Sequence, residues 1–115
     1  MAQPTLVAEA TRDLGQGLAA FRADMGGRLS RVTLVAMSEF GRRAYENSGL
    51  GTDHGRATAM FLLGGGIRGG RVYRDWPGLT HDQLEGPGDL RVTIDFRDIL
   101  GEVVRERLGN PRLDQ

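Results

Sequence analysis

The chain has 115 residues, with fifteen basic and fifteen acidic side chains and a formal net charge of zero. A chain of this length forms one domain at most and can bury a modest core. The balanced charge provides no basic surface, so neither nucleic acid nor a membrane is expected as a partner. The absence of Cys excludes disulfides, Cys-ligated zinc and thiol nucleophiles. The longest apolar runs, of about six residues, are far too short to span a membrane, and no export signal is visible.

The first half of the chain predicts one helix and two strands. Apolar side chains recur at steps of three and four over residues 6–25, which predicts an amphipathic helix that Gly26-Gly27 end. Residues 32–37 are rich in β-formers and apolar on both faces, which indicates a central strand of a covered, parallel sheet. The polar, Gly-rich residues 41–57 predict a loop, and residues 59–63 predict a second buried strand.

The second half predicts a long surface excursion between short strands. Gly64-Gly65-Gly66 are expected to end the second strand, with a tight backbone path at positive φ. We favour this structural role over a phosphate loop, because the run lacks the Gly-Lys-Ser/Thr ending of such a loop. Residues 71–73 suit a short strand, and turn residues over 76–88 indicate a surface segment with two turns. Residues 90–94 alternate apolar and polar side chains, as an edge strand would.

A second helix is predicted after Asp95, which is expected to cap it. Asp98 in the first turn and basic residues in the last turn complement the helix dipole. Gly109 and then Pro111 are expected to stop the helix. Its apolar face comprises Ile99, Leu100, Val103, Val104 and Leu108.

The order helix, strand, loop, strand, excursion, helix predicts an α/β fold with too few strands for a complete doubly wound sheet. Strands that are buried on both faces need helices on both sides and further strands at the edges. A partner therefore covers one edge of a small sheet, as in a homo-oligomer, or the chain is part of a larger domain. We favour the second interpretation.

Five motifs, SEFGR, GTDHG, MFLLGGG, GGRVY and WPGL, follow one another in this order. With them the chain resembles, over residues 14–108, the bacterial family called domain of unknown function 1501, which is related to sulfatases and the alkaline phosphatase superfamily. The resemblance covers only the C-terminal part of such proteins. It implies that residues 1–115 are the C-terminal portion of a sulfatase-like domain, with a partial layered sheet and flanking helices.

The resemblance also implies a location for metal ligands. Members of the family are several times longer, are often exported by the twin-arginine route, and carry the nucleophile and first ligands near the N-terminus. Glu39 stands where the superfamily has a late acidic ligand, and His54 where it has a late histidine, with Asp53 as an alternative. The expected ion is zinc, manganese or calcium. Phe40 stands where the superfamily more often has a histidine, so one ligand is missing.

Each of these residues also has a structural interpretation. Glu39 could form a salt bridge with Arg42 or Arg43 instead of binding metal or acting as a general base. His54 could bond to the backbone of a loop. Asp53 could orient a ligand or cap a turn.

Two more polar residues of the SEFGR motif have alternative roles. Arg42 could bind a substrate oxyanion in a bidentate manner, or it could pair with Glu39 or Glu46. Ser38 lacks the G-x-S-x-G pattern of a nucleophile elbow, so we expect its hydroxyl to bond to the loop.

These features predict the C-terminal segment of a metal-dependent hydrolase of sulfate or phosphate esters. No nucleophile is identifiable, so the chain would be hydrolase-like only when a missing N-terminal half completes it. The alternative is a non-catalytic interaction or scaffolding domain that retains the fold without the metal. A third hypothesis, binding of small anions, depends on Arg42, Arg56 and the glycine run. The sequence leaves the substrate and the cellular location open.

Overall fold

The structure, a computed structural model, describes the backbone of residues 3–49 and 51–109, with side chains from residue 7 onward. It contains two α-helices, two 3-10 helices (labelled η) and four strands in that part of the chain. In order they are α1 (Gln3–Met25), η1 (Gly26–Arg31), β1 (Thr33–Ala36), β2 (Gly41–Glu46), β3 (Thr52–Gly55), β4 (Phe61–Gly64), η2 (His81–Gln83) and α2 (Phe96–Leu108).

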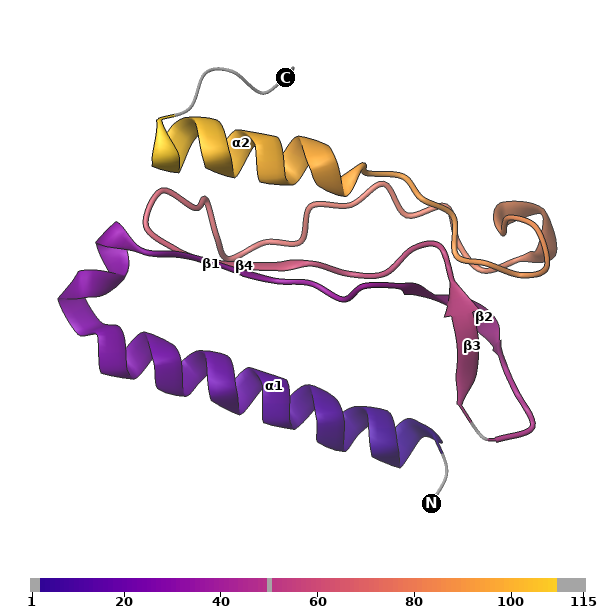
Figure 1. Cartoon of the computed structure of the whole chain (residues 1–115). Helices are drawn as coiled ribbons and strands as arrows, with labels where there is room; N and C mark the ends of the chain where they lie inside the picture. Colours follow the sequence, from indigo (N-terminus) through magenta and orange to yellow (C-terminus); the bar gives the residue numbers. More distant parts are fainter. Residues whose placement is uncertain (1–2, 50, 110–115) are drawn as a thin grey trace.

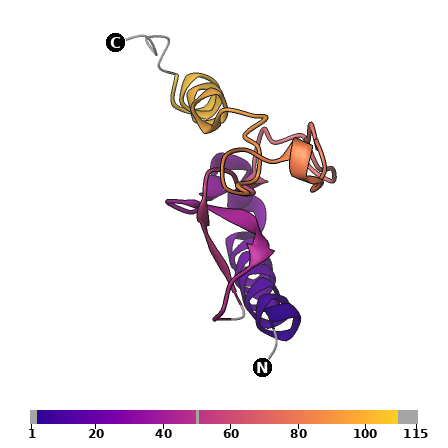
Figure 2. The ribbon, with the colours of Figure 1, turned by 90° about the vertical axis from the view of Figure 1, so that its right-hand side faces the viewer.

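The elements form three layers, and the middle layer is a narrow ribbon of two strands. β1 and β4 run side by side in the middle, with α1 along one side and α2 along the other (Figure 1). The view at right angles shows the same order, from α1 through the strands to α2 (Figure 2). The fold is therefore α/β in general, as predicted, and consists of helices and two small two-stranded sheets.

The prediction of a parallel sheet is wrong, because β1 and β4 are antiparallel. Thr33 is opposite Gly64, and Ala36 is opposite Phe61. A parallel pair needs a crossover connection, usually a helix. Here the chain between the two strands instead extends as an arm and returns along itself. The arm carries the second sheet.

The prediction of a loop over residues 41–57 is also wrong, because this segment forms the antiparallel strands β2 and β3. Their register is irregular between Arg42 and Glu46, which shows a bulge. Asn47 organises the turn: its side-chain oxygen accepts hydrogen bonds from the backbone N–H groups of Gly49 (2.9 Å) and Gly51 (3.1 Å). This is the local bonding by which Asn stabilises turns.

The strands predicted at 71–73 and 90–94 are absent from the described structure, where both segments are irregular. The excursion is instead attached to the free edge of β2. The Ala44 N–H donates to the Gly88 carbonyl (2.9 Å), and the Leu90 N–H donates to the Arg42 carbonyl (3.2 Å). β2 thus lies between β3 and residues 88–90.

The first predicted helix is confirmed as α1, which ends at Met25. Gly26 follows with φ of 51°, and the chain continues as η1. Leu18, Phe21 and Met25 are half-buried, whereas all of residues 7–17 are exposed. Only the C-terminal half of the α1 stripe is therefore covered. None of the described helices is long and apolar enough to cross a membrane.

The second predicted helix is confirmed as α2, with the predicted caps. The Asp95 carboxylate accepts a hydrogen bond from the Arg97 N–H, and Gly109 ends the helix with φ of 68°. Pro111 lies outside the described residues. Arg107 connects α2 to the strand layer, since its guanidinium donates to the Thr33 hydroxyl (3.0 Å) and the Ser30 carbonyl (2.8 Å).

The glycines at the end of β4 have the predicted structural role. Gly64 has φ of 131°, and a side chain there would meet the Val32 carbonyl. The Gly65 N–H donates to the carbonyls of Val32 (2.9 Å) and Leu29 (3.1 Å). The backbone of this turn therefore packs directly against the segment before β1.

The prediction of two buried strands is wrong, because no apolar side chain among the described residues is buried. The side chains of β1 are half-buried, and Phe61 in β4 is exposed. The radius of gyration is 16.6 Å, whereas a compact domain of this length has about 13 Å. Two strands provide too little sheet for the helices on either side to enclose a core.

Candidate functional site

The hairpin of β2 and β3 brings the SEFGR motif close to the TDHG part of the GTDHG motif. Arg42 in β2 is directly opposite His54 in β3. Glu39 lies in the junction between β1 and β2, and Asp53 precedes His54 in β3. The two motifs that carry the predicted ligands are therefore neighbours across a strand pair, although the sheet containing them was not predicted.

An aromatic stack holds the two motifs against each other. The ring of Phe40 lies on the imidazole of His54, with centroids 3.6 Å apart and planes 21° from parallel. The Arg42 guanidinium carbon lies 5.3 Å from the centre of the same phenyl ring. His54 is thus held by a side chain and is not bonded to the backbone of a loop. Its two ring nitrogens make no hydrogen bond to the described residues.

Arg42 has a structural contact within the hairpin. Its guanidinium donates to the Thr52 carbonyl (2.8 Å), which crosses from β2 to β3. Neither Glu39 nor Glu46 forms an ion pair with it in the described part of the chain. The guanidinium is exposed, so donors remain for a substrate oxygen.

Asp53 is bound to residues that support the hairpin. Its carboxylate accepts hydrogen bonds from the Asn47 amide (3.0 Å) and the Arg43 guanidinium (3.5 Å). Arg43 also donates to Asp89 (3.1 Å), which lies in the excursion. Asp53 therefore acts here in the turn and in an ion-pair network. This favours the structural alternative for Asp53 over the role of metal ligand.

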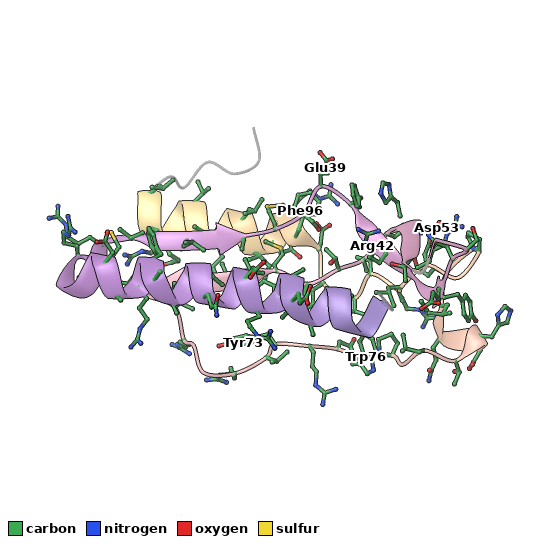
Figure 3. All side chains as sticks on the ribbon, turned by 90° about the horizontal axis from the view of Figure 1, so that it is seen from below. Glu39, Arg42, Asp53, Tyr73, Trp76 and Phe96 are labelled. Atoms are coloured by element: carbon green, nitrogen blue, oxygen red, sulfur yellow. The ribbon has the colours of Figure 1, made fainter. Side chains whose placement is uncertain are left out.

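Glu39 is exposed, and its side chain projects outward from the junction, whereas Asp53 lies farther along the hairpin (Figure 3). The salt bridge with Arg42 or Arg43, which is the structural alternative for Glu39, is not formed in the described part of the chain. The Ser38 hydroxyl donates to the Phe40 carbonyl (2.8 Å), which confirms that Ser38 bonds to its own loop. That Glu39 and His54 share one ion stays a prediction.

The Glu39 carboxylate and the His54 imidazole are chemically suitable ligands for a divalent metal, but they are too few to form a site by themselves. Carboxylate and imidazole are ordinary ligands of zinc, and a catalytic zinc has three protein ligands and a water. Within residues 3–49 and 51–109, no group of three or more His, Asp or Glu side chains could hold an ion. Glu39 and His54 would supply two ligands of this kind.

The sequence reasoning missed Phe40 and Arg43 as residues that organise the site. In the sequence, Phe40 only marks the place of an absent histidine, and its stack with His54 depends on the hairpin register. Arg43 connects β2 to Asp53 and Asp89, which are far apart in sequence. The run Asn47-Ser48-Gly49 was a signal for a turn, since Asn side chains bond to backbone N–H groups in turns.

Comparison with known proteins identifies the family. A family model described as "Protein of unknown function (DUF1501)" matches residues 2–102. No curated protein and no solved structure matches the chain. The matched segment covers most of the 115 residues. The chain therefore belongs to the DUF1501 family of proteins of unknown function.

Proposed function

We propose that this chain is the C-terminal segment of a sulfatase-like, metal-dependent hydrolase domain that acts on sulfate or phosphate esters. One observation carries the proposal: His54 lies beside the SEFGR motif, with its ring held by Phe40 and its nitrogens unbonded within the described structure. A histidine in this state can donate a lone pair to a metal. The resemblance to the alkaline phosphatase superfamily supports the same role for Glu39.

A divalent metal held by these residues would act as a Lewis acid and neutralise charge on the transferred group. The residues of this chain would bind and orient. His54 and Glu39 would each contribute one ligand, and Arg42 would donate to an oxygen of the ester, since its guanidinium is exposed beside His54. Asp53 would support the hairpin through Asn47 and not bind the ion.

The segment alone is catalytically incomplete in this proposal. Two ligands do not organise an open catalytic geometry, and Ser38, the hydroxyl nearest to Glu39 in sequence, bonds to its own loop. Losing a positioned nucleophile forfeits about 7–11 kcal/mol of barrier reduction. The remaining ligands and the nucleophile would come from a missing N-terminal half or, alternatively, from another subunit of a homo-oligomer.

Metal titration of the full chain tests this proposal. Isothermal titration with zinc, manganese and calcium should show weak binding that His54→Ala and Glu39→Ala each reduce at least about tenfold, since each removes one of few ligands. His81→Ala is the matched control, because His81 is an exposed histidine in η2, outside the hairpin. Equal binding in all three variants would contradict the metal site.

Assays with nitrophenyl phosphate and nitrophenyl sulfate test the incompleteness. We expect no turnover by the chain alone, with or without these metals. Turnover that survives repurification and disappears in Glu39→Ala and His54→Ala would show that the chain is a complete enzyme. Such a result would overturn the incompleteness but support the assignment of the two ligands.

The alternative is a non-catalytic interaction or scaffolding domain. The stacking of Phe40 on His54 favours it in one respect, because a phenyl ring occupies the place where the superfamily more often has a histidine ligand. In this alternative the stack and the Arg43 network only stabilise the hairpin. Absence of metal binding by the wild-type chain, together with a loss of hairpin stability in His54→Ala, would decide for it.

A further inference from the structure

The chain between the glycine turn and η2 contains an exposed segment, residues 68–79, which we call the Arg-aromatic segment. Residues 68–76 are all exposed. Tyr73 and Trp76 have 57% and 55% of their surface accessible, and Val72 has 81%. Tyr73 and Trp76 lie along one margin of the molecule, and Glu39 lies at the opposite margin (Figure 3). The segment is therefore separate from the candidate metal ligand Glu39.

Local contacts hold the Arg-aromatic segment, although it has no regular secondary structure. The Tyr73 hydroxyl donates to the Arg68 carbonyl (2.8 Å), and the Arg71 guanidinium carbon lies 5.2 Å from the centre of the Tyr73 ring. Directly after the segment, the Thr80 N–H donates to the Gln83 side chain (2.9 Å). Contacts of this kind reduce the entropy that a surface loses when it binds a ligand.

The charge of the Arg-aromatic segment differs from that of the whole chain. The chain is formally neutral, whereas this segment contains three Arg and one Asp, an excess of two positive charges. Arg68, Arg71 and Arg74 form no ion pair with the described residues. A guanidinium group donates two parallel hydrogen bonds to an oxyanion. Exposed guanidinium groups beside aromatic rings therefore suit a ligand with anionic groups on a partly apolar body.

We propose that the Arg-aromatic segment binds a sulfated polysaccharide. Tyr73 and Trp76 would pack on the C–H faces of sugar rings, and the three Arg side chains would donate to sulfate oxygens. The choice of sulfate rests on the proposed ester hydrolase, of which such a polymer would be the substrate. One part of the polymer would be held here while another part reaches the hairpin. Binding energy from a remote part of a substrate can then support the reaction.

A nucleic acid fits the same segment less well. Nucleic-acid-binding proteins that depend on phosphate contacts make about 6–10 of them, whereas this segment offers three guanidinium groups. The neutral chain also provides no long-range attraction for a polymer with a charge on every unit. A sugar ring offers an apolar face to Tyr73 and Trp76, and its sulfate groups need fewer cations.

The fluorescence of Trp76 provides the first test, because Trp76 is the single Trp of the chain. Dextran sulfate is titrated without metal, with neutral dextran as the matched control. The sulfated polymer should change the Trp76 emission in a saturable manner, and neutral dextran should bind at least about tenfold more weakly, as expected for loss of charge-assisted bonds. No change of emission, or equal binding of both polymers, would overturn the inference. Tighter binding of oligothymidine would overturn it in favour of a nucleic acid.

Substitutions of the cations provide the second test. Arg71→Ala and Arg74→Ala should each weaken binding and reduce the slope of log affinity against log salt by roughly one, as for a lost phosphate contact. Arg12→Ala is the control, because Arg12 is an exposed Arg of α1. Equal slopes in these three variants would overturn the inference.

Substitutions of the aromatic residues distinguish this surface from a simple ion exchanger. Trp76→Leu should weaken retention on immobilised dextran sulfate at least about fivefold, as loss of aromatic stacking does for other polymers. Tyr73→Phe should bind like the wild type, whereas Tyr73→Leu should not. Wild-type retention of Trp76→Leu and Tyr73→Leu would overturn the inference. Retention of the wild-type chain with no metal binding at Glu39 and His54 would overturn the hydrolase but support this surface.

Discussion

Phe40 and His54 stack nearly face to face, with ring centroids 3.6 Å apart, across the junction that leads into the β2/β3 hairpin. Stacking covers a face of the imidazole but leaves its nitrogens, which lie in the ring plane, uncovered. The contact therefore restricts the orientation of His54 without occupying its hydrogen-bonding positions. It ties the SEFGR motif directly to His54 of the GTDHG motif.

Replacing Phe40 by Leu should release the His54 ring. Leu keeps apolar bulk but removes the aromatic ring current, so the imidazole proton resonances of His54 should move downfield. Aromatic pairs contribute about 0.5–1.5 kcal/mol, so amides of β2 and β3 should exchange roughly two- to tenfold faster. NMR of the imidazole protons measures the first effect, and the His81 resonances are the control. Unchanged His54 resonances would contradict the stack.

Gly64→Ala should loosen the turn after β4. Its φ of 131° is a conformation that L-residues rarely adopt, and the added methyl group would meet the Val32 carbonyl. Such strain costs about 1–3 kcal/mol. The amides of β1 should then exchange at least about fivefold faster. Gly69→Ala is the control, because a side chain there meets nothing within 4 Å. Equal effects of the two substitutions would refute this account.

Arg43→Ala should detach the excursion from β2. Its guanidinium holds both Asp53 and Asp89, and the Leu90 N–H bonds to the strand beside it. Partly exposed ion pairs contribute about 0.2–1 kcal/mol, so the Leu90 amide should exchange up to about fivefold faster.

Arg43→Lys should restore only part of the protection lost in Arg43→Ala, because an ammonium group lacks the planar fork of donors that contacts two carboxylates. Arg71→Ala is the control: this guanidinium lies over Tyr73, away from the hairpin. Hydrogen exchange by mass spectrometry distinguishes the variants. If the Leu90 amide exchanges equally in all of them, the ion pairs do not hold the excursion.

The cap of α2 should make this helix sensitive to acid. Hydrogen bonds from the Arg97 guanidinium, and then from its backbone N–H, lower the pKa of Asp95 from 3.8 to about 2. Because the pKa is lower in the folded state, the stabilisation is complete above pH 3.8 and is lost as the pH falls through about 2. Helicity of residues 96–108 should decline over that range. Carboxyl NMR of Asp95 and circular dichroism measure the two quantities.

Asp95→Asn separates the charge of the cap from its hydrogen bond. Asn caps helices about as well as Asp, so α2 should persist at neutral pH. The part of the acid-induced loss of helicity that Asp95 causes should disappear. Asp95→Ala should instead lower the helicity of α2 at every pH. An Asp95→Asn variant that loses helicity in acid as steeply as the wild type would show that other carboxylates cause the decline.

Local signals determined the helices and the turn after β4. Asp95 and Gly109 cap α2 through bonds to residues a few positions away. The periodicity of residues 6–25 predicted α1, and Gly64 adopts the positive φ expected of it. These features depend on neighbours in sequence, so a single sequence contains the information for them.

The hairpin of β2 and β3 was beyond local reasoning. The residues of this hairpin are polar and show no alternation of apolar and polar side chains. One edge of β2 is bonded to residues 88–90, and Arg43 forms an ion pair with Asp89 instead of packing in a core. The contacts that stabilise it join Arg42 to Thr52 and Arg43 to Asp89. Only the folded chain shows that these distant residues meet.

The sequence by itself predicted strands with apolar side chains at residues 32–37 and 59–63, which the structure has as β1 (Thr33–Ala36) and β4 (Phe61–Gly64). It also indicated Glu39, Asp53 and His54 as candidates for metal ligands. The tertiary structure alone decided that the strands are antiparallel, since apolar side chains on both faces do not specify direction. It also decided which side chains these candidates contact. Asp53 bonds to Arg43 and Asn47, whereas His54 stacks on Phe40 with its nitrogens uncovered, because strand register fixes which side chains meet.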